Sequence, residues 1–142
     1  MKYQFNIETD HFQILIGDRV KGPRVDTAAL WSGGQSVAAL SSVPELIGLS
    51  IARFGGRTRV GVDVVESQPE TQLGWKEQGE FSLYVPSGSI RLWGPETIDF
   101  EQVVSIPLKP GTYSGRAFSR GTDEVLDEMA NEDPMSIVSF YG

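Results

Sequence analysis

The chain has 142 residues, of which 39% are hydrophobic and 22% charged, and its formal net charge is −7. This length suits one domain over residues 1–142, with a core large enough to need no disulfide or metal. The absence of cysteine excludes a disulfide framework, a thiolate nucleophile and a cysteine-ligated zinc site. Because like charges repel, the negative charge disfavours nucleic acid and anionic membranes as partners and favours a basic protein.

The first segment alternates polar and apolar residues from Lys2 to Glu8, a pattern typical of a strand with one buried face. It lacks the continuous apolar run of a signal peptide, and no stretch of the chain approaches the length of a membrane span, so we expect a cytoplasmic protein. A second strand is expected over residues 11–16. Asp26 and Thr27 are suitable caps for a short helical turn that ends near Trp31.

Three turn signals predict hairpins in the middle of the chain. Gly55-Gly56 suits a type I′ turn between residues 46–54 and 57–66. Pro86-Ser87-Gly88 predicts a hairpin of residues 81–85 with 89–93, and Lys109-Pro110-Gly111 one of residues 100–108 with 112–119. Alternation along these strands predicts a set of inward-facing apolar residues: Val60, Val62, Val64, Phe81, Leu83 and Val85.

Short strands dominate the predicted secondary structure, and residues 136–141 form a closing strand. No long amphipathic helix alternates with the strands, which disfavours a parallel βαβ fold. The sequence therefore predicts an all-β protein, an antiparallel β-sandwich of eight or more strands with at most one or two short helical turns, and a barrel as the alternative.

No set of residues has the pattern of a catalytic or metal site. His11 is the single histidine, so a Ser-His-Asp set or a histidine-based zinc site has too few candidates. The acidic stretch near the C-terminus lacks the alternating ligands and glycine of a calcium-binding loop. We therefore predict no catalytic residues, no cofactor and no metal, and keep hydrolysis by paired carboxylates as a minor hypothesis.

The excess negative charge lies almost entirely at the C-terminal end. Residues 121–142 hold six acidic residues and no Lys or Arg, whereas the first 120 residues hold thirteen acids and twelve bases. Either this is a solvated charge run, or it is an electrostatic docking surface for a basic partner. The predicted partner-binding residues are four acids of this stretch, a tryptophan in a polar run (Trp75) and one that could be either core or exposed (Trp31): Asp123, Glu124, Asp127, Glu128, Trp75 and Trp31.

The order of these features resembles the competence protein J family, small bacterial inhibitors of a DNA-entry nuclease. The similarity begins at Asp10-His11-Phe12-Gln13-Ile14-Leu15-Ile16 and includes the element Ile106-Pro107-Leu108-Lys109-Pro110-Gly111-Thr112-Tyr113. The acidic stretch and the short closing strand follow in similar order. The resemblance implies an antiparallel sandwich and non-catalytic inhibition of a nuclease or toxin. It carries over no individual site residue.

Besides the minor hypothesis of hydrolysis, two binding functions follow from the sequence. The first is an inhibitor or immunity-like protein that binds a basic protein such as a nuclease or toxin. The alternative is a carbohydrate-binding or small-ligand-binding module that uses an exposed tryptophan as its stacking surface.

Overall fold

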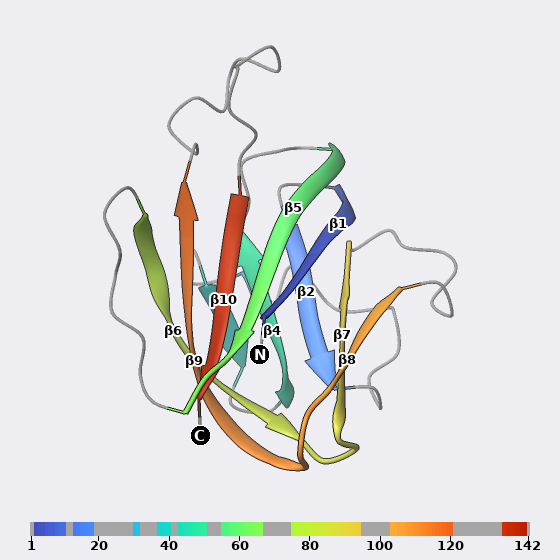
Figure 1. Cartoon of the computed structure of the whole chain (residues 1–142), viewed down its shortest axis with the longest axis vertical. Helices are drawn as coiled ribbons and strands as arrows, with labels where there is room; N and C mark the ends of the chain where they lie inside the picture. Colours follow the sequence, from blue (N-terminus) through green and yellow to red (C-terminus); the bar gives the residue numbers. More distant parts are fainter. Residues whose placement is uncertain are drawn as a thin grey trace.

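The computed structural model describes residues 2–10, 13–18, 30–31, 37–40, 43–50, 55–66, 75–94, 103–120 and 135–141. These residues form ten strands (Figure 1). In chain order the strands are β1 (Lys2–Asp10), β2 (Gln13–Asp18), β3 (Val37–Leu40), β4 (Val43–Ser50), β5 (Gly55–Val64), β6 (Lys76–Val85), β7 (Ser89–Trp93), β8 (Val104–Pro107), β9 (Gly111–Arg120) and β10 (Met135–Tyr141). The predicted all-β class is confirmed.

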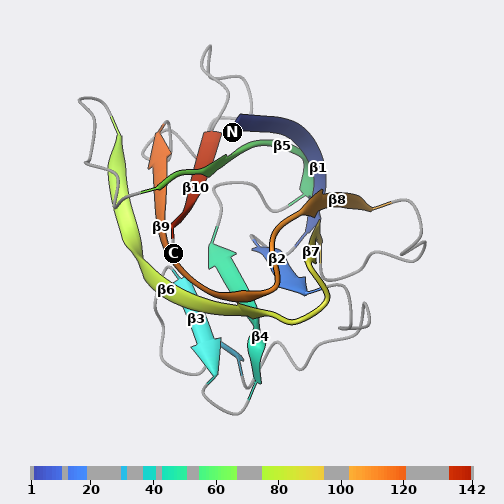
Figure 2. The same cartoon turned by 60° about the horizontal axis from the view of Figure 1, so that its bottom comes forward.

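The strands form two layers packed face to face (Figure 2). One layer has the order β3-β4-β2-β7-β8 and the other β1-β5-β10-β9-β6. The neighbours in each layer are antiparallel, except that β10 runs parallel to β5. The Asp10–Gln13 pair joins the layers at the corner between β1 and β2. The predicted β-sandwich is confirmed.

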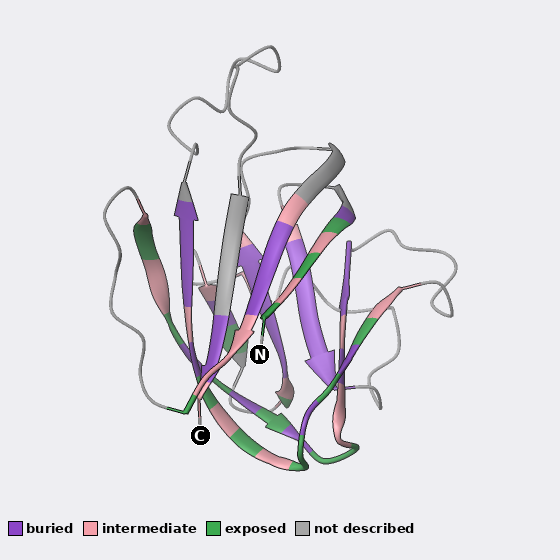
Figure 3. Cartoon of the chain, in the orientation of Figure 1, coloured by how far each residue is buried: buried purple, intermediate pink, exposed green. Residues whose placement is uncertain are grey.

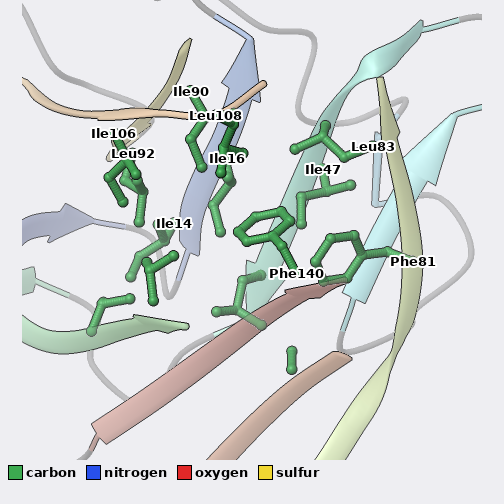
Figure 4. Packing of buried hydrophobic residues seen from close by; sticks show 14 of the residues in the cluster. Ile14, Ile16, Ile47, Phe81, Leu83, Ile90, Leu92, Ile106, Leu108 and Phe140 are labelled. Atoms are coloured by element: carbon green, nitrogen blue, oxygen red, sulfur yellow. The ribbon is translucent and has the colours of Figure 1, made fainter. Parts of the chain in front are cut away.

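The main core lies between the layers (Figure 4). Phe140 of β10 is fully buried, and its ring meets the rings of Phe81 and Tyr113 edge-on, with centroids 5.6 and 6.3 Å away. The predicted inward face of β5 and β6 is confirmed, since Val60, Val62, Leu83 and Val85 are all fully buried. Phe81 is 9% exposed, and Val64 is half-buried against the same cluster.

A second cluster covers the outer surface of the β3-β4-β2-β7 region. Its buried members are Leu15, Leu30, Ala38, Leu46 and Trp93. In β2, Ile14 and Ile16 face the main core while Leu15 between them faces this outer cluster. The continuous apolar run of β2 therefore reflects burial on both faces. Leu30 has helical backbone, and the rest of the predicted helical turn at residues 26–29 lies outside the described residues.

The predicted hairpin at Gly55-Gly56 is wrong. These two glycines are the first residues of β5, where they pair with Asp10 and Thr9 of β1. The preceding strand β4 pairs with β2 and β3 in the other layer. The chain therefore crosses from one layer to the other between β4 and β5, and apolar residues of both strands belong to the core between the layers.

The two other predicted hairpins form one bent ribbon instead. β6 pairs with β9 and β7 pairs with β8, and the register is the same on both sides of the bend: Val85 lies opposite Gly111 and Ser89 opposite Pro107. Pro86-Ser87-Gly88 and Lys109-Pro110 therefore bend the paired chains from one layer to the other (Figure 2). Prolines suit a break in a ladder because they have no N–H to donate.

Two polar contacts fix the geometry of the ribbon. At the bend, the backbone N–H and the hydroxyl of Ser87 donate to Oδ2 of Asp18, at 3.1 and 2.9 Å, and Asp18 is fully buried. Gly88 follows with φ of 78°, a conformation that favours glycine. At the other end of the ribbon, the register shift between Glu77 and Gly79 accompanies Gln78, whose Nε2 donates to the carbonyl of Ser50 in β4 at 3.0 Å.

Candidate functional site

Several residues singled out from the sequence lie outside the described part of the chain. They are the four acids Asp123, Glu124, Asp127 and Glu128, and also His11. Their role in partner binding, or in the case of His11 the absence of a role, stays a prediction.

Trp31 lies against the outer surface of β2 and β4. Its indole Nε1 donates to Oε1 of Gln13 at 2.8 Å, and its ring packs beside the second cluster. The ring sits over Gly48 so closely that a Cβ atom at that position would be 2.8 Å from Cζ2 of Trp31. Trp31 is therefore a half-buried ring held in one orientation, and it helps to cover its layer.

Trp75 directly precedes β6 in the opposite layer and is also half-buried. It takes part in interactions with its surroundings. The two tryptophans predicted as anchors thus come from different layers of the sandwich.

The outer face of β6 and β9 carries a polar cluster that the sequence interpretation missed. Arg116 of β9 binds Glu77 of β6 with two hydrogen bonds, Nε to Oε1 at 3.0 Å and Nη2 to Oε2 at 2.5 Å. Glu80 lies 3.7 Å from the same guanidinium. The hydrogen bond to Glu77 raises the pKa of Arg116, and the charges of Glu77 and Glu80 add to this effect.

The guanidinium of Arg116 also lies over an aromatic ring. The Cζ atom of Arg116 lies 5.3 Å from the centre of the Phe118 ring, within the range of a cation–π contact. The Arg116 side chain is 13% exposed, whereas those of Glu77 and Glu80 are 34% and 60% exposed. Carboxylates rather than the guanidinium therefore dominate the accessible surface here.

The same face carries Tyr84, whose exposed fraction is 41%. Among the described residues it is the one large hydrophobic side chain that is exposed. Alternation in β6 could have identified it, because Phe81, Leu83 and Val85 point inward and so Ser82 and Tyr84 must point outward. The pairing with β9, which brings Arg116 beside Glu80, could not be predicted from alternation.

Among the residues that the structure describes, no three His, Asp or Glu side chains are grouped closely enough to hold a metal ion. No helix within the same ranges is long and apolar enough to span a membrane.

The fold is similar to two solved structures over nearly the whole chain. The first is ComJ from Bacillus subtilis, described as an inhibitor of the DNA-degrading activity of NucA, with a TM-score of 0.72 and 13% identity over 100% of this chain and 97% of ComJ. The second is described as crocagin biosynthetic gene J, with a TM-score of 0.66 and 18% identity over 99% of this chain and 96% of the other. No family model matches the sequence, and no curated protein matches it.

The resemblance to the competence protein J family is thus confirmed in the fold, from end to end. The identities are too low to carry more than the fold, and the two similar structures have different descriptions. One sandwich can support different functions, so function has to be argued from the surface of this chain.

Proposed function

We propose that this chain is a non-catalytic inhibitor that binds a basic protein, such as a nuclease or toxin. The observation that carries the proposal is the end-to-end similarity of its fold to ComJ, which is described as an inhibitor of a nuclease. The net charge of −7 adds to it, because a nuclease that binds DNA needs a basic groove. An acidic protein can occupy such a groove by placing carboxylates where phosphates would lie.

The acidic stretch is the first part of the proposed docking surface. Asp123, Glu124, Asp127 and Glu128 lie in a span that holds no Lys or Arg. Exposed charges contribute little to fold stability, even when they are paired. Their clustering is better explained by binding to a basic partner. Attraction between opposite charges speeds association, and contact with Lys or Arg relieves the repulsion between the acids. Trp75 and Trp31 are proposed as accompanying anchors, and we propose no nucleic acid or membrane partner.

The proposal is tested by replacing the four acids with Asn or Gln. Thermal stability should stay nearly unchanged, while association with the inhibited nuclease should slow by about an order of magnitude or more at low salt. The difference should shrink as salt screens charges beyond about 8 Å at physiological ionic strength. An unchanged association rate and salt dependence would assign these four residues to a solvated segment.

A ligand-binding module is the second candidate function. It is favoured by Trp31, whose ring is already fixed on the sheet by Gln13 and so loses little freedom when a ligand stacks on it. Saturable quenching of tryptophan fluorescence by sugars, abolished by Trp31→Ala but retained in Trp75→Ala, would favour this candidate. We also propose that the protein is cytoplasmic and that residues 1–142 form a single domain.

A further inference from the structure

The accessible faces of the sandwich differ in what they expose. Between the layers the side chains form the main core, and much of the outer surface of the β3-β4-β2-β7 region is covered by the second cluster. Along β6 and the first half of β9, exposed residues instead alternate with buried or half-buried ones, as the colours of these strands show, so the outer face carries the exposed residues (Figure 3). β6 is the last strand of its layer (Figure 1).

Tyr84 stands among small hydroxyl side chains on this face. It pairs with Thr112 across the strands, and the next outward pair is Ser82 with Ser114. All three hydroxyl residues are exposed. Their side chains reach less far from the sheet than a tyrosine ring, so the ring projects from a low polar surround. An exposed tyrosine is a common anchor in protein interfaces, because it brings a large rigid contact area and a polar end.

Farther along this face the exposed charge is negative. Glu80 is the outward residue of β6 that precedes Ser82, four residues from Tyr84, and it pairs with Arg116. The single positive charge of Arg116 is bonded to Glu77 and largely covered, whereas the Glu80 side chain is 60% exposed. Two carboxylates against one covered guanidinium complement a lysine or arginine on a partner.

We infer that the outer face of β6 and β9 is a docking surface for a protein with a basic surface, with Tyr84 as its anchor and Glu80 as its charged rim. The inference rests on the proposed function and extends it, since it adds a surface that lies apart in sequence from the acidic stretch. A projecting ring with carboxylates farther along the same strands fits a folded protein, whose surface offers a pocket for the ring and, farther along, a basic side chain.

The test measures inhibition of DNA degradation. The probe is the nuclease fraction of the native host that a cation exchanger retains, assayed on a fluorescent DNA duplex in the presence of the full chain. Tyr84→Thr, which keeps a residue that favours strands, should raise the concentration for half-inhibition by about tenfold or more. Glu80→Gln should raise it by less, and its effect should disappear at high salt. Glu45→Gln removes the same charge from β4 in the other layer and should have no effect.

The outcomes separate this inference from the proposed function. If the unaltered chain inhibits and Tyr84→Thr inhibits equally well, the β6–β9 face is not the docking surface, although the proposed function stands. If the unaltered chain does not inhibit the fraction, the proposed function fails and the docking surface with it. Circular dichroism of each variant checks that it has kept the fold. Slower hydrogen exchange in β6 and β9 within the complex would support the inference without any substitution.

Discussion

The two layers of the sandwich differ in how many of their faces are buried. In the layer containing β2 and β4, Ile14, Ile16 and Ile47 face the main core, while Leu15 and Leu46 face the second cluster. In the layer containing β1 and β6, the inward residues are buried or half-buried, and many outward ones of these two strands are exposed (Figure 3). The layer containing β2 and β4 therefore has apolar residues buried on both faces. The layer containing β1 and β6 leaves polar residues exposed, and a partner can bind to them.

The local sequences reflect this difference. The run Ile14-Leu15-Ile16 is apolar throughout, as expected for a strand covered on both sides. The segments Lys2–Ile7 and Glu80–Val85 alternate, as expected for strands with one wet face. Residues on the solvent-exposed face can be substituted without disturbing the core, so a binding function can be altered there.

The largest effect is expected in the core that both layers share. Phe140→Ala should lower the free energy of unfolding by about 3–5 kcal/mol, because the fully buried ring would leave a cavity between Phe81 and Tyr113. Denaturant titration measures this loss, and Phe140→Leu is the milder control. A loss below about 1 kcal/mol, well short of that range, would mean that the two layers are not held together at this point.

A smaller change in the free energy of unfolding is expected to distinguish the two faces of the layer that contains β1 and β5. Val62→Ala should cost about 1–3 kcal/mol through lost burial. Gln4→Ala, on the exposed side of β1, should change the free energy of unfolding by less than about 0.5 kcal/mol. Equal costs for the two variants would remove the distinction between a buried and an exposed face of this layer.

The cover of the other layer can be tested at Gly48. Gly48→Ala would place a methyl group 2.8 Å from Cζ2 of Trp31 and 2.9 Å from Cδ2 of Leu30. We expect a loss of about 1 kcal/mol, at the lower end of overpacking costs, because residues on an outer surface can shift. Tryptophan emission should move to longer wavelength as Trp31 is displaced, while Ala39→Ser on the exposed side of β3 should leave it unchanged. An unaltered spectrum and stability would show that Trp31 does not cover this layer in solution.

The smallest effect is expected at the proposed docking face. Tyr84→Thr should change the free energy of unfolding by less than about 0.5 kcal/mol, as is usual for exposed sites. Tyr113→Thr should cost more, because its ring packs on Phe140 and its hydroxyl donates to the carbonyl of Lys109 at 2.7 Å. If Tyr84 proved the more costly of the two, it would be a structural residue rather than a surface available to a partner.

Much of the strand content and burial was predictable, whereas strand pairing was not. Alternation identified the inward residues of β5 and β6, and Pro-Ser-Gly identified a place where the chain bends, whereas Gly55-Gly56 proved to lie inside β5. A turn signal does not say whether the chain reverses beside itself or crosses to the opposite layer. At residues 86–88 the bend carries β6 into β7 in the other layer, because β9 and β8 run alongside both. The cluster of Arg116, Glu77 and Glu80 depends on that pairing and so was missed.

By itself the sequence determined the all-β class, the net negative charge, the exclusion of cysteine chemistry and the side of each alternating strand that is buried. These properties are local or additive, since the period of side chains along a strand and the sum of charges need no knowledge of distant contacts. Tertiary structure alone decided which strands share a layer, that Leu15 and Trp31 cover an outer surface, and that Arg116 of β9 lies beside Glu80 of β6. Those outcomes depend on contacts between residues far apart in the chain. Such contacts form only when the apolar faces of the two layers pack together and are buried.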